Sequence, residues 1–188
     1  VAEKDNNPVL IIDAVQLPLA RRHSTPCVST MHGRLDIAGL DVFYREFRDM
    51  PLVSVSDAQR TPLPMANWAG TVLHGLPQQI YVPGSGTGGY LAIVGRISPE
   101  KGIDRAIQIA RASGMPLKIA AKVERVDREY FETKIRPCID GRSVEFLGEV
   151  AEADKAQLLG EAAALLFPIA WPEPFGIVMI ESMACGTP

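Results

Sequence analysis

The sequence contains few cysteines and no long apolar run. Its 188 residues include three scattered cysteines, Cys27, Cys138 and Cys185, and no pair of them has metal-ligand spacing. This cysteine usage is typical of the reducing cytosol, so we expect a cytoplasmic location. No apolar stretch approaches the roughly 20 residues that a membrane helix needs. The first residues, VAEKDNNP, have neither the basic region nor the apolar core of a secretory signal.

Basic residues are also sparse and form no run. The formal net charge is -3, which gives no indication of a nucleic-acid-binding face and leaves only a local basic pocket open. Hydrophobic residues make up 47% of the chain and charged residues 22%, a balance that favours a folded globular protein over a disordered one.

Both ends of the sequence suggest a longer protein. The chain has no initiator Met and stops at Gly186-Thr187-Pro188, where a helix has ended with a glycine and a further strand would follow. We therefore expect a fragment that is cut at both ends and inactive by itself.

Apolar runs alternate with helical stretches through the first half. We predict strands over 9–13, 26–32, 51–56 and 71–74, and helices over 17–22 and 37–48. Ser56 or Asp57 can cap a short helix after the third strand. Strands that alternate with helices predict a parallel sheet covered by helices on both faces.

The composition changes at residues 77–89, where Pro83-Gly84-Ser85-Gly86-Thr87-Gly88-Gly89 is typical of a flexible linker. Its glycines are followed by a strand over 90–94 and do not open a helix, so they fail the context of a dinucleotide-binding fingerprint. We predict a first domain over 1–82, a linker over 83–89 and a second domain over 90–188.

The second half repeats the alternation. We predict strands over 90–94, 117–121, 144–148 and 163–169, the last buried on both faces. Helices are predicted from Ile103, over 127–135, over 153–163 and from Gly176 onward. The first of these helices has Ile103, Ala106, Ile107 and Ala110 on one face, and Met179 and Met183 of the last helix are predicted to pack in the core.

Two carboxylates stand in the last eighteen residues, WPEPFGIVMIESMACGTP, with seven residues between them. Glu173 lies between two prolines at the carboxyl end of a predicted strand, which is where open α/β sheets bind ligands. Glu181 follows Ile177 by one helical turn on the largely apolar side, so its carboxylate needs a partner to offset desolvation. A pair of ligand hydroxyls would serve.

Two cations flank the predicted helix start near residue 103. Arg96 and Lys101 oppose the helix macrodipole there by roughly 0.3–1 kcal/mol each, and a bound anion would resolve the conflict. A nucleotide diphosphate suits a planar Arg fork beside a Lys point charge. The alternative to anion binding is that Lys101 is solvated and Arg96 is structural. The Glu173 motif favours anion binding over this alternative.

The spacing of Glu173 and Glu181, with Pro174-Phe175-Gly176 between them, resembles the signature of the family 4 (group 1) retaining glycosyltransferases. That resemblance implies a GT-B fold of two Rossmann-like parallel-sheet domains, both incomplete here. It covers nearly all of the second half and is weaker in the first half. Further matching stretches are Gly95-Arg96, Ser98-Pro99-Glu100-Lys101-Gly102, Gly148-Glu149, Gly186-Thr187-Pro188, Thr30-Met31-His32-Gly33 and Val53-Ser54-Val55-Ser56-Asp57.

The resemblance also implies roles for single residues. Arg96 and Lys101 would hold the leaving diphosphate in the place of a metal cation, so that no metal or other cofactor is expected. Glu181 would bind the ribose hydroxyls as a double acceptor. The remaining donor-site residues implied are Glu173 with Phe175 and Gly176 at the donor sugar, together with Gly95 and Ile177.

Two implied residues have equally good structural explanations. The backbone near Gly148-Glu149 would lie close to the nucleobase, although an acid at a helix entry is as good a reading of Glu149. His32 ends a strand and would reach the donor sugar as a catalytic residue, although a strand-end His that caps a carbonyl is as good a reading.

The implied activity is transfer of a sugar from a nucleotide sugar to an acceptor hydroxyl with retention of configuration. The two glutamates do not fit a retaining glycosidase, whose carboxyls lie about 5–5.5 Å apart. Eight mostly helical positions separate their backbones by roughly 10 Å or more. We therefore expect no covalent intermediate on Glu181.

Two rival functions remain from the sequence: a non-catalytic sugar-nucleotide or partner-binding module of the same fold, and a nucleotide-sugar 2-epimerase. The Pro-Phe-Gly turn favours a transferase over an epimerase. The expected partners are a nucleotide sugar and a sugar, lipid or small-molecule acceptor, without nucleic acid. Peripheral membrane association through a missing N-terminal part is a further expectation.

Overall fold

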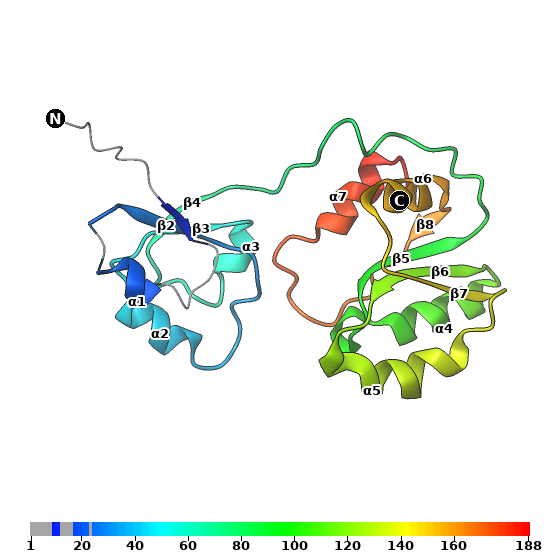
Figure 1. Ribbon diagram of the computed structural model, residues 1–188, viewed down its shortest axis with the longest axis horizontal. Coiled ribbons are helices and arrows are strands. Elements are labelled where there is room, and N and C mark those ends of the chain that lie inside the picture. The colour runs from blue at the N-terminus through cyan, green and yellow to red at the C-terminus, as the bar shows by residue number, and fades with distance from the viewer. Residues whose placement is uncertain (1–8, 12–16, 23) are drawn as a thin grey trace. The chain divides into compact units, whose positions relative to one another are not determined.

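A computed structural model describes residues 9–11, 17–22 and 24–188, with 9–11 described by their backbone. The chain divides into two compact units (Figure 1). The first unit consists of Val1–Gly75 with Pro172–Phe175, and the second of Leu76–Trp171 with Gly176–Pro188. Each unit is described by itself below.

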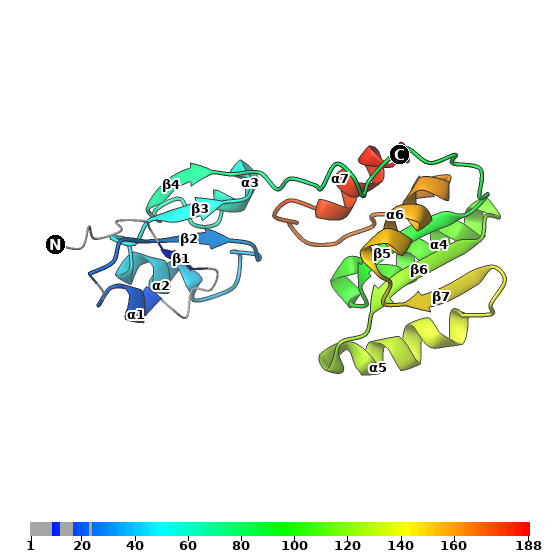
Figure 2. The same ribbon diagram turned by 45° about the horizontal axis from the view of Figure 1, so that its top comes forward.

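The first unit contains a parallel sheet in the order β1-β2-β3-β4 (Figure 2). Helix α3 is capped as the sequence predicts, because Ser56 Oγ accepts a hydrogen bond of 3.1 Å from the backbone N–H of Gln59. The core gathers large apolar side chains from α1, α2, the strands and the loop after α3, chiefly Leu17, Met31, Tyr44, Leu52 and Leu63. The elements are β1 (Val9–Ile11), α1 (Leu17–Ala20), β2 (Cys27–Met31), α2 (Leu40–Glu46), β3 (Leu52–Ser54), α3 (Asp57–Arg60) and β4 (Trp68–Thr71).

The fourth strand lies earlier in the chain than predicted. The sequence places it at 71–74, whereas β4 covers Trp68–Thr71 and leaves Val72 and Leu73 exposed. Strand β3 ends at Ser54, whose carbonyl accepts from the N–H of Val72 at 2.8 Å. The pairing partner ends there, so the apolar residues that follow gain no place in the sheet. Of the strand predicted over 9–13, residues 12–13 lie outside the described residues.

The second unit contains a parallel sheet in the order β7-β6-β5-β8. Helices α4 and α5 lie on one face of this sheet, and α6 and α7 lie on the other (Figure 2). The strands are β5 (Leu91–Arg96), β6 (Leu117–Lys122), β7 (Val144–Gly148) and β8 (Ala164–Leu165). The helices are α4 (Ile103–Ser113), α5 (Arg128–Tyr130), which continues as a π-helical stretch (Phe131–Ile135), α6 (Glu152–Glu161) and α7 (Ile177–Ala184), with 3-10 turns at Pro99–Lys101, Arg125–Asp127 and Arg136–Cys138.

The main core of the second unit lies between the sheet and α4. The predicted apolar face of α4, made of Ile103, Ala106, Ile107 and Ala110, is buried there, which confirms that prediction. Strands β5 and β6 pair in register to their ends, so Arg96 lies opposite Lys122. The carboxyl ends of β5 and β6 therefore place two basic residues on one edge of the sheet.

Strand β8 is shorter and less buried than predicted. The sequence indicates a strand over 163–169 that is buried on both faces, whereas β8 covers Ala164–Leu165 and is half-buried. Beyond it the backbone makes other contacts: the carbonyl of Pro168 accepts from Arg105 Nε at 2.8 Å, and the N–H of Ala170 donates to the carbonyl of Glu100 at 2.9 Å. These contacts replace the strand ladder.

The prediction that Met179 and Met183 pack in the core is wrong. Met183 is 64% exposed and Met179 is also exposed, while Glu181 and Ser182 are the buried residues of α7. Helix α7 can turn this polar face inward because Ser182 Oγ donates to the carbonyl of Thr187 at 2.9 Å and Glu181 accepts from the buried hydroxyl of Tyr81 at 2.8 Å. Satisfied polar groups decide the orientation of this helix.

The glycine-rich segment 83–89 is bonded into the second unit. Gly84, Gly86 and Gly88 donate backbone hydrogen bonds of 2.9–3.0 Å to the carbonyls of Cys185, Gly160 and Glu161. A Cβ on Gly84 would lie 2.1 Å from the carbonyl oxygen of Gly160. Close approach of two backbones therefore requires glycine here, whereas the sequence suggested that the glycines provide flexibility.

Candidate functional site

The loop from β5 to α4 begins the candidate site at the carboxyl edge of the second sheet. Gly95 has φ 152°, and a Cβ built on it would meet no atom within 4 Å, so the space beside its backbone is open. Ser98 is completely buried at the start of the turn Pro99–Lys101. Ligands of open α/β sheets bind at this edge.

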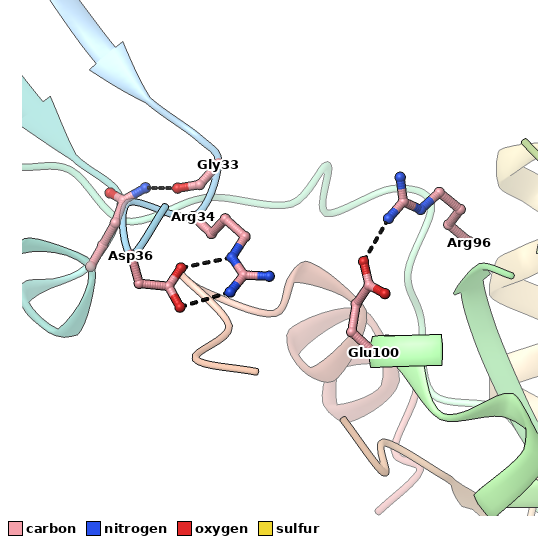
Figure 3. A network of polar contacts seen from close by, with 6 residues as sticks. Gly33, Arg34, Asp36, Arg96 and Glu100 are labelled. Atoms are coloured by element: carbon pink, nitrogen blue, oxygen red, sulfur yellow. Dashed lines mark hydrogen bonds and ion pairs between the residues drawn. The ribbon is translucent and has the colours of Figure 1, made fainter. Parts of the chain in front are cut away.

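Arg96 occupies the last position of β5 and is paired with two carboxylates. Its guanidinium lies 3.0 Å from Glu100 Oε1, as Figure 3 shows, and 3.6 Å from Asp127 Oδ2. The side chain remains 44% exposed. These carboxylates offset the unfavourable position of Arg96 near a helix start, and the exposed fork can exchange them for an anionic ligand.

Lys101 ends the same turn and faces two aromatic rings. Its ammonium lies 5.0 Å from the ring centroid of Trp171 and 5.8 Å from that of Phe167, both in the segment after β8. Such distances are those of cation–π contacts. Lys101 is therefore held beside the segment that leads to Glu173.

Gly102 permits the two loops to lie together. It has φ 72°, and a Cβ there would lie 2.3 Å from the carbonyl oxygen of Pro168 and 2.4 Å from the guanidinium of Arg105. Arg105 also bonds the Pro168 carbonyl. A glycine and one arginine thus fasten the β5–α4 loop to the segment after β8.

Glu181 lies on α7 and is 5% exposed. Its Oε1 accepts a hydrogen bond of 2.8 Å from the hydroxyl of Tyr81 and one of 2.7 Å from the ammonium of Lys155 on α6. Glu152 also lies within hydrogen-bond distance of the Tyr81 hydroxyl, whose single proton the two carboxylates share, and 3.5 Å from Lys155. The partner that the sequence required for Glu181 is thus present within the chain.

The environment of this cluster changes two pKa values. Burial, together with the hydrogen bonds to Glu152 and Glu181, raises the pKa of Tyr81. The hydrogen bond from Tyr81 lowers the pKa of Glu152. Tyr81 therefore remains a neutral donor between two carboxylates at neutral pH.

Gly176 and Ile177 form the start of α7. Gly176 is its N-cap with φ 78°, in the left-handed region that favours glycine, and Ile177 is exposed. Strand β7 is the edge strand at the opposite end of the sheet from β8. Glu149 is exposed directly after β7, next to Gly148 with φ 73°. No hydrogen bond or ion pair is recorded for Glu149 among the described residues.

Glu173 belongs to the short segment that groups with the first unit. Ser56 Oγ donates to the carbonyl of Pro174, and Glu173 lines a hollow of about 40 Å³ together with Arg34 and Asp36. Arg34 and Asp36 form a two-pronged ion pair with bonds of 2.7 and 2.8 Å (Figure 3). Glu173 is half-buried beside this pair.

His32 follows β2 and is exposed. Its ring stacks on that of His74 at 5.2 Å, and His74 meets the ring of Phe175 edge-on at 5.0 Å. Burial, with a smaller effect of His32, lowers the pKa of His74. His32 therefore touches an aromatic group that includes one residue of the glutamate motif.

The structure thus brings the predicted residues together in two groups. Arg96, Lys101, Gly95, Gly176, Ile177, Glu149 and Glu181 lie in the second unit, and His32, Glu173 and Phe175 lie in the first. Sequence reasoning missed Lys155 and Tyr81. Tyr81 is 100 residues from Glu181, so no local spacing could indicate their contact.

Residues 9–11, 17–22 and 24–188 contain no group of three or more His, Cys, Asp or Glu side chains that could hold a metal ion. None of the helices described there is long and apolar enough to cross a membrane.

Several solved structures have folds similar to that of this chain. Alr3699/HepE from Anabaena, in complex with UDP and glucose, is 21% identical with a TM-score of 0.72, covering 93% of this chain and 54% of that one. Sucrose-phosphate synthase from Thermosynechococcus elongatus is 20% identical with a TM-score of 0.74, covering 93% and 52%. AviGT4, a glycosyltransferase involved in avilamycin A biosynthesis, is 26% identical with a TM-score of 0.67, covering 87% and 48%.

These likenesses, with the two parallel sheets, confirm the predicted α/β fold of GT-B type. The chain spans about half the length of the solved structures that it matches.

A family model places the chain more narrowly. The model described as "Glycosyl transferases group 1" matches residues 83–188, which is more than half of the chain. The protein therefore belongs to the group 1 glycosyl transferases, as its glutamate motif predicts. A comparison with curated protein sequences found no match.

Proposed function

We propose that the protein transfers a sugar from a nucleotide-sugar donor to an acceptor hydroxyl with retention of anomeric configuration. One observation carries this proposal: the β5–α4 loop with Arg96 and Lys101 is fastened to the segment after β8, at the carboxyl edge of a sheet whose last helix buries Glu181. The family match covers these same residues.

The proposed chemistry requires fixed positive charge where the diphosphate departs. Arg96 and Lys101 supply it, and preorganised charges of this kind stabilise a developing anion without reorganisation. Arg96 exchanges Glu100 for phosphate oxygens, because its fork is exposed. Gly95 offers open backbone beside them.

The other contacts to the donor follow the family motif. Glu181 accepts from the ribose, and Glu149 and Ile177 lie near the nucleoside. Glu173, with the backbone of Phe175 and Gly176, binds the sugar, and His32 completes the catalytic group. The transfer uses no metal or other cofactor and forms no adduct on Glu181.

The wider setting is also part of the proposal. The unit of Leu76–Trp171 with Gly176–Pro188 contributes the nucleotide-sugar side, and residues 1–75 contribute the acceptor side. The acceptor is a sugar, a lipid or another small molecule, and the protein works in the cytoplasm, with peripheral membrane association for a lipid acceptor.

Donor binding tests the proposal. UDP-, GDP-, ADP- and TDP-glucose are screened by thermal shift, since a ligand that binds the folded state raises its melting temperature. Arg96→Ala should lower the affinity for the nucleotide sugar roughly ten-fold or more, because charge-assisted hydrogen bonds contribute about 1.5–3 kcal/mol each. Arg142→Ala, at the amino end of β7, is the matched control and should leave binding unchanged.

Transfer is measured separately. Glu173→Ala should abolish sugar transfer while donor binding survives, and proton NMR of the product should show the anomeric configuration of the donor. A protein that no nucleotide sugar stabilises, or a glycosyl adduct trapped on Glu181, would contradict the proposal.

A further inference from the structure

Glu181 receives one buried and one partly buried donor on a single carboxylate oxygen. Tyr81 and Lys155 both bond Oε1, at 2.8 and 2.7 Å. A carboxylate oxygen has two lone-pair sites, so these donors fill Oε1. In the part of the chain that the structure describes, no donor contacts Oε2.

We propose that Tyr81 and Lys155 are positioning residues for donor recognition, which occupy Oε1 so that Glu181 binds the ribose through Oε2 alone. This inference rests on the proposed function. It alters the expectation from the sequence, in which both oxygens of Glu181 were available to a hydroxyl pair.

Burial makes this arrangement more than a surface contact. Glu181 is 5% exposed, and the side chain of Lys155 is 18% exposed. The desolvation of a carboxylate buried to this extent is offset only by pairing and hydrogen bonds. The ammonium of Lys155 also lies 5.5 Å from the ring centroid of Tyr81, so the two donors support each other.

Glu152 competes for the same donors. The hydroxyl of Tyr81 has one proton and two carboxylate neighbours, Glu152 and Glu181. Glu152 has 52% of its side chain exposed, so water can replace Tyr81 there, whereas the buried Glu181 has no such substitute. Although the Tyr81 hydroxyl lies closer to Glu152, the proton stabilises the buried Glu181 more, and a bond to Glu181 fixes the rotation of its carboxylate.

A fixed carboxylate recognises hydroxyl groups with less entropic cost than a rotating one. The contribution of Tyr81 and Lys155 should therefore appear with a ligand that carries the ribose hydroxyls and vanish with one that lacks them. A residue that only supports the fold would affect both ligands equally.

Calorimetric titration can separate these cases. Binding of UDP, GDP and ADP to the protein is measured, and the tightest is compared with its 2′,3′-dideoxy form. The wild type should prefer the ribonucleotide roughly ten-fold or more. Tyr81→Phe and Lys155→Met should each lower the affinity for the ribonucleotide roughly ten-fold. Each should lower the affinity for the dideoxy form less than about two-fold.

The chain offers matched controls. Tyr90 is a buried tyrosine whose hydroxyl donates to the carbonyl of Leu158 at 2.9 Å, and Lys118 lies 4.2 Å from the Tyr90 ring centroid. Tyr90→Phe and Lys118→Met should leave the preference for the ribonucleotide unchanged. Lys155→Arg keeps the positive charge and should retain most of the preference for the ribonucleotide. If Lys155→Met does not fold, Tyr81→Phe alone tests whether these residues position Glu181.

Three results would overturn the inference, and they differ in what they say of the proposed function. If the variants weaken both ligands equally or neither, Tyr81 and Lys155 do not position Glu181, and the proposed function stands. If the wild type binds both forms equally, Glu181 does not bind ribose, although donor binding survives. If no nucleotide binds the wild type, the proposed function fails as well.

Discussion

Gly102 is a residue on which the close packing of the β5–α4 loop depends. Its left-handed backbone and its contact with the Pro168 carbonyl leave no space for a Cβ. Gly114, at the other end of α4, has nearly the same φ, 69° against 72°, yet a Cβ there would meet nothing within 4 Å. A comparison of alanine substitutions at the two glycines therefore distinguishes the cost of backbone strain from the cost of close packing.

Gly102→Ala should destabilise the protein by about 2–4 kcal/mol, the sum of roughly 1–2 kcal/mol for a left-handed alanine and a similar cost for overpacking. Gly114→Ala should cost only the first part, about 1–2 kcal/mol. Urea unfolding measures both. Equal losses in the two variants would show that the contact with Pro168 contributes nothing.

At the scale of elements, one tyrosine ties α5 to the start of α4. The hydroxyl of Tyr130 donates to Asp104 Oδ1 at 2.8 Å. Burial, together with this hydrogen bond, raises the pKa of Tyr130 to about 12. The phenol is thus held neutral while the helices remain packed.

This raised pKa makes the packing of the two helices sensitive to alkaline pH. A tyrosine in an unfolded chain ionises near pH 10. Because the folded pKa is the higher one, the contribution of Tyr130 to stability is complete below about pH 10 and is lost as the pH rises toward 12. Between about pH 10 and 12 the free energy of unfolding of the wild type should therefore fall more steeply with pH than that of Tyr130→Phe.

Urea unfolding at several pH values measures the effect, and ultraviolet absorbance follows the ionised phenol. Tyr81 and Tyr90 also have raised pKa values, from burial first, so the comparison must be between the wild type and Tyr130→Phe. Parallel losses of stability in both proteins would contradict a role for Tyr130.

At the scale of the whole molecule, the chain has separate apolar cores. Leu52 lies in the core of the first unit with 1% exposure, and Ile119 lies in the main core of the second with none. Each core is built from elements of its own unit. A cavity in one core should therefore destabilise that unit first.

Leu52→Ala and Ile119→Ala should each cost about 2–5 kcal/mol locally, as core truncations to alanine do. Hydrogen exchange followed by mass spectrometry should show faster exchange in β2–β4 for the first variant and in β5–β7 for the second. Faster exchange across the whole chain in either variant would show that the two units unfold as one.

Much of the fold was predictable because local patterns and sheet architecture agree. The strands over β5, β6 and β7 and the buried face of α4 follow from apolar periodicity alone. The errors lie at β4, at β8 and in the exposed methionines of α7. At β8 and α7 hydrogen bonds to residues distant in the sequence overrode the apolar pattern, and at β4 the paired strand ended first.

The sequence by itself determined the alternation of strands and helices, the family motif and the residue types of the candidate site, because these depend on local spacing. Only the tertiary structure decided that Glu181 shares one oxygen between Tyr81 and Lys155, and that Gly102 joins two loops. Such contacts depend on which distant segments share space, and a buried charge or a missing Cβ acquires its meaning from those neighbours.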